Sequence, residues 1–275
     1  MMKNNLKISF IGGGNMATAL IGGIAGKLTD GGNIHVVDPK PEALDALQRR
    51  YGVTTATGIG DAIAASDVIV LAVKPQQLHE VALELALHLS QQLVLSIAAG
   101  IRAADLSRWL GGHRAIVRTM PNTPALIGQG VTGMVALDGV SQEQKAQADA
   151  IMCAAGATVW LEQESQIDAV TAVSGSGPAY VFYFIEAMQQ AATELGLNAE
   201  QGRALAIATF TGAAQLAAQS DEPVPVLRER VTSKGGTTFA ALTSMEQDHV
   251  KAAIVRALKA AHARSQELGE ELGHN

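Results

Sequence analysis

The stretch FIGGGNMA, residues 10–17, is the feature that most restricts what this chain can fold into. It follows the apolar run KISFI and opens the first predicted helix. Gly12, Gly14 and Ala17 fit the pattern G-x-G-x-x-G/A, in which the first glycine permits a tight turn and the second lets a pyrophosphate approach the backbone. The small third residue lets the helix lie against the sheet. The pattern predicts a dinucleotide-binding strand–turn–helix, and an ordinary glycine-rich turn is the alternative.

The first 165 residues alternate between short β-branched runs and stretches with helical spacing. The predicted strands are KISFI, IHVVD, DVIVLAV, LVLSIA, AIVRTM, GMVAL and TVWLE, and helices are predicted over 41–51 and 76–90. Ser141 with Gln144 forms the pattern of a capping box, which predicts another helix start. This alternation predicts an α/β fold, with a mainly parallel, doubly wound, Rossmann-type sheet.

From Gln166 the pattern becomes helical throughout. A helix is predicted up to Gly196, Asn198 is expected to cap the next one, and a long helix is predicted from Asp248 to Leu268. We therefore expect two domains, a sheet domain at 1–165 and an all-helical domain at 166–275.

Composition excludes several classes of function. The formal net charge is −6 and no basic tract occurs, which argues against a nucleic-acid or anionic-membrane partner. Cys153 is the only cysteine, and no cluster of Cys and His has zinc-ligand spacing, so we expect no metal site. The start of the chain lacks the features of a signal peptide, and the longest apolar run, VIVLAV, is too short to span a bilayer. The predicted location is the cytoplasm.

Asp38 ends the second predicted strand, where an acidic residue usually binds the ribose 2′-hydroxyl of NAD. A carboxylate there favours NADH and repels the 2′-phosphate of NADPH, a repulsion that Lys40 could offset. Capping of the following helix is an equally weighted and compatible role for Asp38.

Two further motifs, LAVKP and RTMPNTP, end predicted strands at the edge where open α/β sheets bind ligands. The alternative for each motif is that its proline only ends the strand. Together with the glycine turn they outline one cleft. The predicted cofactor contacts are Gly12, Gly14, Asn15, Met16, Ala17, Asp38, Ala72, Val73, Lys74, Pro75, Met120, Pro121 and Asn122.

The region 173–190 contains no Lys, Arg or His. Oxidation of an alcohol needs a base at such a position, whereas a protonated iminium accepts hydride directly. The sequence therefore favours reduction of a C=N bond.

The stretch VTSKGGTTFAAL, residues 231–242, joins two predicted helices. A helix is expected to start near Thr237 or Thr238. The successive N–H groups from Gly235 to Thr238, with glycine allowing positive φ, could form an anion-binding nest. The hydroxyls of Ser233 and Thr238 would add donors. A tight turn with Ser/Thr capping is equally compatible with the spacing. The lysine precedes the glycines, so the stretch is not a phosphate-binding Walker loop.

Over nearly its whole length the chain resembles the pyrroline-5-carboxylate reductase family, through FIGGGNMA, LAVKP, MPNTP, SGSGPAY and above all LRERVTSKGGTTFAAL. The resemblance implies reduction of 1-pyrroline-5-carboxylate to L-proline by NADPH or NADH, the last step of proline synthesis. It also implies a homodimer formed by interlocking helices of the C-terminal dimerisation domain, with dimers assembled further, commonly as a ring of five.

The resemblance implies that the signature loop binds the substrate carboxylate and that Thr238 lies near the ring nitrogen as a possible proton donor. It implies catalytic roles for Thr238 and Ser233. The substrate contacts that it implies are Ser233, Gly235, Gly236, Thr237, Thr238, Ser176 and Gly177.

Two positions depart from the family pattern. Lys234 stands where many members have proline, and Asp38-Pro39 stands where many NADPH-preferring members have Asn-Arg or Ser. The second departure leaves the choice between NADPH and NADH open. A reductase of a related cyclic imine and an inactive dinucleotide-binding sensor are the rival interpretations.

Overall fold

The computed structural model describes residues 5–273, and the chain divides into two compact units. The first unit contains the residues up to Ser176 together with those from Ala261 onward, and the second contains Gly177–Ala260. The chain's contacts thus return the end of the last helix to the first unit. The domain boundary at 165/166 stays a prediction from the sequence pattern. The compact units divide the chain elsewhere, after Ser176 and again before Ala261.

The first unit is built on an eight-stranded sheet with the order β3-β2-β1-β4-β5-β6-β7-β8. All neighbouring strands are parallel except β6 and β7. The strands are β1 (Ile8–Ile11), β2 (Ile34–Val37), β3 (Thr54–Ala56), β4 (Val68–Leu71), β5 (Leu93–Ser96), β6 (Ile116–Met120), β7 (Gly130–Ala136) and β8 (Gly156–Trp160). The predicted mainly parallel, doubly wound sheet is confirmed, and the order reverses direction between β1 and β4.

Strand β3 is the one strand that the sequence pattern did not predict. It has only three residues, and none of them is buried. It pairs with β2 at the edge of the sheet, where Thr54 Oγ1 lies 2.9 Å from His35 Nδ1. Burial lowers the pKa of His35. A short, polar edge strand lacks the alternating apolar residues on which sequence prediction depends.

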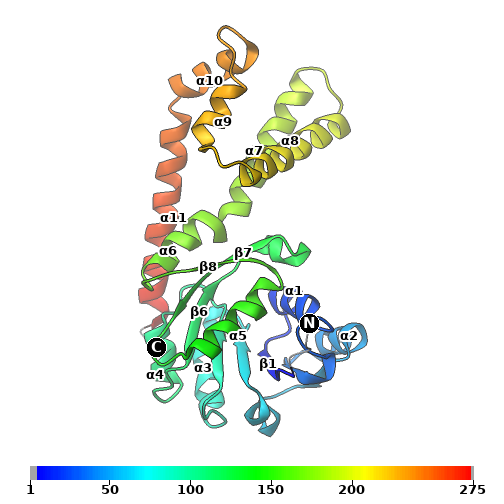
Figure 1. Ribbon diagram of the computed structural model, residues 1–275, viewed down its shortest axis with the longest axis vertical. Coiled ribbons are helices and arrows are strands. Elements are labelled where there is room, and N and C mark those ends of the chain that lie inside the picture. Colours follow the sequence, from blue (N-terminus) through cyan, green and yellow to red (C-terminus); the bar gives the residue numbers. More distant parts are fainter. Residues whose placement is uncertain (1–4, 274–275) are drawn as a thin grey trace. The chain divides into compact units, whose positions relative to one another are not determined.

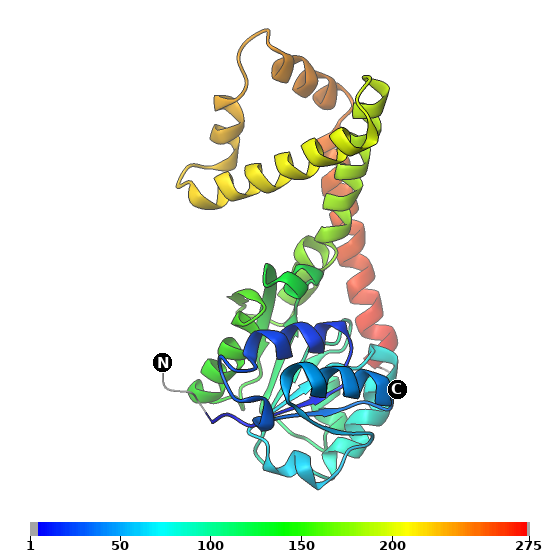
Figure 2. The ribbon, with the colours of Figure 1, turned by 90° about the vertical axis from the view of Figure 1, so that its right-hand side faces the viewer.

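Helices cover both faces of this sheet (Figure 1). One apolar cluster joins the sheet to α1 (Asn15–Ile24), α2 (Pro41–Tyr51) and α5 (Gln142–Cys153), and the other joins it to α3 (Pro75–Ala86) and α4 (Ala103–Trp109). Along β4, Val68 and Val70 face the first cluster while Ile69 and Leu71 face the second. Strands buried on both faces explain the continuous apolar runs in the sequence. Figure 2 shows α1 and α2 lying over the sheet.

Short helical segments complete the first unit. These are η1 (Gly31–Asn33), η2 (Asp61–Ala65), η3 (Thr123–Ile127), α6 (Gln166–Val170) and the π-helical η4 (Thr171–Gly175). The predicted capping box is present at α5, where Gln144 N donates to Ser141 Oγ at 3.1 Å and Ser141 N donates to Gln144 Oε1 at 3.0 Å.

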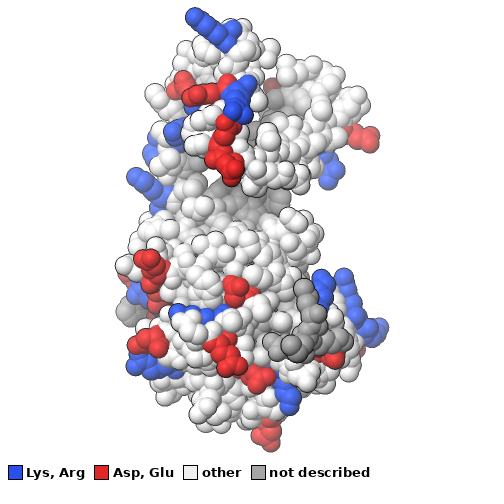
Figure 3. All heavy atoms as spheres, in the orientation of Figure 1, with Lys and Arg blue, Asp and Glu red and all other residues white. Residues whose placement is uncertain are grey.

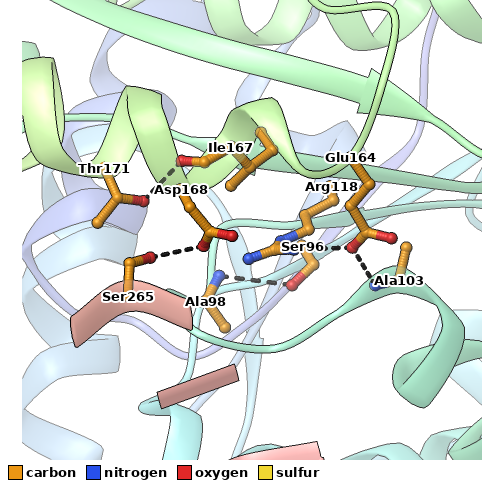
Figure 4. A network of polar contacts seen from close by, with 9 residues as sticks. All are labelled: Ser96, Ala98, Ala103, Arg118, Glu164, Ile167, Asp168, Thr171 and Ser265. Atoms are coloured by element: carbon orange, nitrogen blue, oxygen red, sulfur yellow. Dashed lines mark hydrogen bonds and ion pairs between the residues drawn. The ribbon is translucent and has the colours of Figure 1, made fainter. Parts of the chain in front are cut away.

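A polar network attaches α6 and the end of the last helix to this sheet (Figure 4). Buried Arg118 on β6 donates to Glu164 Oε1 at 2.7 Å, and the same oxygen accepts the Ala103 N–H at 2.6 Å. Ser265 Oγ donates to Asp168 Oδ1 at 2.7 Å. Pairing with a carboxylate satisfies a guanidinium that would be costly to bury alone.

The second unit is helical throughout. It contains α7 (Gly177–Glu194), α8 (Ala199–Gln219), α9 (Val224–Arg230), α10 (Thr237–Gln247) and the first part of α11 (Val250–Gly273). Gly196, at φ +94°, follows α7, and Asn198 caps α8, as predicted. Its capping box with Gln201 was not predicted. Among the described residues of this unit only Gly202 and Ala206 are buried.

Over the described residues no helix is long and apolar enough to cross a bilayer. In the same part of the chain no group of three or more His, Cys, Asp and Glu side chains could hold a metal ion. Acidic and basic side chains are interspersed on the face drawn in Figure 3.

We expect Gly23→Ala to destabilise the protein although alanine favours helices. A Cβ on Gly23 of α1 would collide with the carbonyl oxygen of Ala154, where backbone has to move to admit it. Urea unfolding should show a loss of about 1–3 kcal/mol. Gly32→Ala is the control, because a Cβ there meets no atom within 4 Å, and its effect should stay within about 0.5 kcal/mol. Equal stability of the two variants would contradict this packing argument.

Candidate active site

The glycine turn joins β1 to α1 at the carboxyl edge of the sheet. Gly12 has φ +104°, its N–H donates to the Val37 carbonyl at 2.7 Å, and an added Cβ would lie 2.6 Å from the carbonyl oxygen of Ala72. Both the conformation and the space require glycine. Gly12 therefore performs the turn that its place in the motif predicts.

Gly14 is the N-cap of α1, and no side chain caps this helix start. Its φ is −71°, and a Cβ added to it would meet no atom within 4 Å. The open space lies beside the first amides of the helix, at Asn15 and Met16. Uncapped N–H groups at a helix N-terminus form a site for an anion such as pyrophosphate. Ala17 is fully buried in the core, and its small side chain lets α1 pack closely there.

The carboxylate of Asp38 is already bound to two backbone amides. Oδ2 accepts the Gly13 N–H at 2.8 Å, and Oδ1 accepts the Lys40 N–H at 2.9 Å. The hypothesis that Asp38 is the N-cap of the next helix is wrong: α2 has Lys40 as its N-cap and Pro41 at its first position, because proline suits the first turn. Each carboxylate oxygen keeps a lone pair for a ribose hydroxyl.

The two proline motifs follow β4 and β6. Ala72–Pro75 comes directly after β4, Lys74 is the N-cap of α3, and Pro75 opens that helix. Met120 is the last residue of β6. Because β1, β4, β5 and β6 are parallel, these motifs lie on the same edge as the glycine turn. The structure thus brings together the edge residues that the sequence predicted as cofactor contacts, and whether each contacts a cofactor stays a prediction.

The end of β6 also meets the segment that carries Ser176. Asn122 Nδ2 donates to the Ser174 carbonyl at 3.1 Å, and a Cβ on Gly175 would lie 2.5 Å from Met120 Cε. Ser176 N donates to the Thr171 carbonyl at 2.8 Å, which closes the π-helical turn. Gly177 then begins α7.

The signature loop lies in the second unit, between α9 and α10. Gly235 has φ +74°, Gly236 N donates to the Ser233 carbonyl at 3.0 Å, and α10 begins at Thr237. The predicted helix start and positive φ are confirmed. Gly236 is the N-cap, without a side-chain capping bond, so the alternative of Ser/Thr capping is wrong for this helix start.

One detail of the proposed nest differs from the sequence prediction. The N–H of Gly236 is used by the Ser233 carbonyl and is not available to a ligand. The amides at the start of α10, from Thr237 onward, remain as helix N-terminal donors. Thr237 and Thr238 add hydroxyl groups in the first turn. Such a set of N–H and O–H donors suits a carboxylate.

Sequence reasoning did not single out Gly13 and Ser174. Gly13 is the amide donor to Asp38, and its place in the middle of the GGG run was its only signal. Ser174 presents its carbonyl to Asn122, and its signal was Pro178, four residues later, which has no N–H to offer that carbonyl.

Comparison with known proteins agrees with this arrangement. Residues 164–268 match the family model for pyrroline-5-carboxylate reductase dimerisation, and residues 7–100 match that for NADP oxidoreductase, coenzyme F420-dependent. A pyrroline-5-carboxylate reductase of Pseudomonas aeruginosa is 46% identical over 97% of this chain and 98% of its own. One of Haemophilus influenzae is 41% identical over 95% and 97%.

This chain belongs to the pyrroline-5-carboxylate reductase family.

Solved structures of the family share the fold. A reductase from Coxiella burnetii has a TM-score of 0.91 and 40% identity, covering 96% of this chain and 99% of its own. A Plasmodium falciparum reductase solved with NADP bound has a TM-score of 0.86 and 31% identity, covering 98% and 100%. The family consists of NAD(P)-dependent oxidoreductases, so a nicotinamide dinucleotide is the cofactor. The open, uncapped start of α1 fits the pyrophosphate of such a group.

We expect Gly14→Ala to weaken NAD(P)H binding without destabilising the fold. The added methyl would meet no protein atom but would occupy the space beside the first amides of α1. Titration of nucleotide fluorescence should show a Kd raised about tenfold or more, with an unchanged Tm.

Gly12→Ala is the matched comparison, because there the methyl collides with backbone and φ is unfavourable. Its unfolding free energy should fall by about 1–3 kcal/mol. If Gly14→Ala bound the nucleotide as tightly as the parent, the pyrophosphate would not bind beside Gly14.

Proposed function

We propose that this chain reduces 1-pyrroline-5-carboxylate to L-proline with NADPH or NADH. The observation that carries the proposal is the signature loop, in which an uncapped helix start follows a glycine of positive φ in a chain with reductase relatives over nearly its full length. Such a loop suits a substrate with a carboxylate. The missing base in 173–190 suits a substrate that needs no deprotonation before hydride transfer.

On the cofactor side, the amides at the start of α1 would hold the pyrophosphate, and the Asp38 carboxylate would accept hydrogen bonds from the adenosine ribose. The motifs after β4 and β6 would border the adenosine and nicotinamide ends. When bound, the dinucleotide supplies hydride, whose acceptor here is the C=N carbon of the imine ring, the atom that becomes C5 of proline. The open space at Gly14 and the two amides that orient Asp38 support these roles.

On the substrate side, the proposed contacts are with the signature loop and the start of α7. The amides and hydroxyls from Ser233 to Thr238 would bind the carboxylate, with the Gly236 N–H already used by Ser233. Ser176 and Gly177 would flank the ring. The Thr238 hydroxyl would hydrogen-bond the ring nitrogen. Either water or Thr238 would supply the proton that this nitrogen carries. Orientation of a protonated iminium is then the main task of the protein.

The second unit supports a homodimer as the working form. Phe182, Tyr183 and Leu205 are 64%, 72% and 56% exposed, and the unit buries almost no side chain of its own. A helical unit of this size needs a larger apolar core to be stable. A second copy of the same unit would supply it, in line with the dimerisation model that the sequence matches. A ring of five dimers and a cytoplasmic location remain proposals from the sequence alone.

Turnover with each nucleotide tests the proposed activity. Purified protein is mixed with 1-pyrroline-5-carboxylate and NADPH or NADH in parallel, and L-proline is measured together with nucleotide oxidation. A six-membered cyclic imine carboxylate serves as the competing substrate. Formation of proline with the higher kcat/KM supports the proposal. A higher kcat/KM on the six-membered ring would favour the related imine, and nucleotide binding without any turnover would favour a sensor.

We expect Thr238→Ala to lower kcat while leaving cofactor affinity unchanged. The variant loses a hydroxyl that hydrogen-bonds the ring nitrogen, which should cost about tenfold or more in kcat. Thr243→Ala is the control, because it removes the same group from the same helix, where Thr243 Oγ1 donates to the Phe239 carbonyl at 2.8 Å. Equal kcat in Thr238→Ala and in the parent would exclude Thr238 from the mechanism.

We expect Asp38→Ser to shift preference toward NADPH. Removal of the carboxylate ends its repulsion of the 2′-phosphate, so the ratio of kcat/KM for NADPH to that for NADH should rise about tenfold. Asp45→Ser, on exposed α2 surface, removes the same charge as a control and should leave the ratio unchanged. If Asp38→Ser left the ratio of the two kcat/KM values unchanged, the role of Asp38 would be limited to its two backbone hydrogen bonds.

A further inference from the structure

The carbonyl of Ser174 lacks its usual α-helical donor. In a continuous α-helix its donor would be the N–H of residue 178, but that residue is Pro178. Just before this proline the helix contains a π-helical turn over Thr171–Gly175, which is closed by the hydrogen bond from Ser176 N to the Thr171 carbonyl. A buried or half-buried carbonyl left by such a break needs a donor from elsewhere in the protein.

Asn122 supplies that donor. Its Nδ2 lies 3.1 Å from the Ser174 carbonyl oxygen, and its Oδ1 accepts the N–H of Val131 on β7 at 3.0 Å. Both ends of the carboxamide are therefore bound to backbone. Although Asn122 is the N-cap of η3, its side chain makes no capping bond there. The side chain joins the loop after β6 to the π-helical turn and to β7.

A second contact holds the same two segments together. A Cβ on Gly175 would lie 2.5 Å from Met120 Cε, so the π-helical turn lies against the side chain of the last residue of β6. The Ser174 hydroxyl donates to the Val170 carbonyl at 3.0 Å, a local bond that bends helices. Ser174–Ser176 are therefore held by contacts with the end of β6 and the loop after it, in addition to the bonds of the π-helical turn.

We propose that Asn122 is a positioning residue, which fixes Ser174–Ser176 against the cofactor edge of the sheet and thereby sets where Ser176 meets the substrate ring. This role rests on the proposed function and differs from the direct cofactor contact that the sequence predicted for Asn122. Its loss should misplace the substrate contact and leave dinucleotide binding intact. A displacement of the reacting groups by about 1 Å can cost about a hundredfold in rate.

Asn122→Asp is the sharpest variant. The aspartate keeps an acceptor for the Val131 N–H but presents an oxygen, in place of an N–H, to the Ser174 carbonyl. We expect kcat to fall by about tenfold to a hundredfold, with the Kd for NAD(P)H within about twofold of the parent. Asn33→Asp is the matched control, because Asn33 lies before β2 and its Nδ2 donates to Thr29 Oγ1, at 3.2 Å, rather than to a site segment. Its kcat and Kd should equal those of the parent.

A double-mutant cycle with Pro178→Ala distinguishes positioning from general damage. Alanine restores an N–H at residue 178, which can bond the Ser174 carbonyl and remove its need for Asn122. Asn122→Asp should therefore reduce kcat much less in the Pro178→Ala background than in the parent. Strict additivity of the two substitutions would overturn the proposal, as would a loss confined to dinucleotide affinity.

Amide hydrogen exchange provides a readout that does not depend on the substrate. Asn122→Asp should speed exchange at the Ser176 N–H and leave the amides of β1 protected as in the parent. If the parent protein reduced no imine, the proposed function would fail while this comparison still tested the positioning role. Unchanged exchange at Ser176 would overturn it, even in an active enzyme.

Discussion

The close approach of Gly12 to its neighbours is the constraint on which the ligand edge depends. Its N–H binds the carbonyl that ends β2, and its Cα faces the carbonyl of Ala72 after β4 at a distance that excludes a side chain. Three parallel strands therefore end at one place. The uncapped start of α1 and the carboxylate of Asp38 lie there because the chain leaves β1 through this turn.

The polar groups of that edge are organised by backbone more than by one another. Asp38 is oriented by two amides, and Asn122 by one amide and one carbonyl. Side chains held in this way have fixed rotamers before any ligand binds, which reduces the entropy that binding has to overcome. The same side chains also fasten the turn after β1 and the turn before α7.

The second unit follows a different principle. It exposes large apolar side chains and depends on its helix starts and ends for local definition, with a capping box at Asn198 and an uncapped start at Thr237. The capped end serves stability, whereas the uncapped end leaves backbone donors for an anion. The match of this region to a dimerisation model offers a physical explanation for the exposed apolar residues.

The amino-acid sequence was sufficient to predict the sheet class, most strands, the capping box at Ser141, the cap at Asn198 and a positive φ among the glycines of the signature loop, because each depends on residues close together in the chain. It missed β3, which is too short and polar to have a pattern. One of its two interpretations of Asp38, as the N-cap of α2, is wrong because Pro41 opens that helix and Lys40 is its N-cap. The contact between the Ser174 carbonyl and Asn122, and the return of the end of α11 to the first unit through Ser265 and Asp168, became apparent from the folded structure alone. These contacts join residues 52 and 97 positions apart, and no local periodicity encodes such pairings.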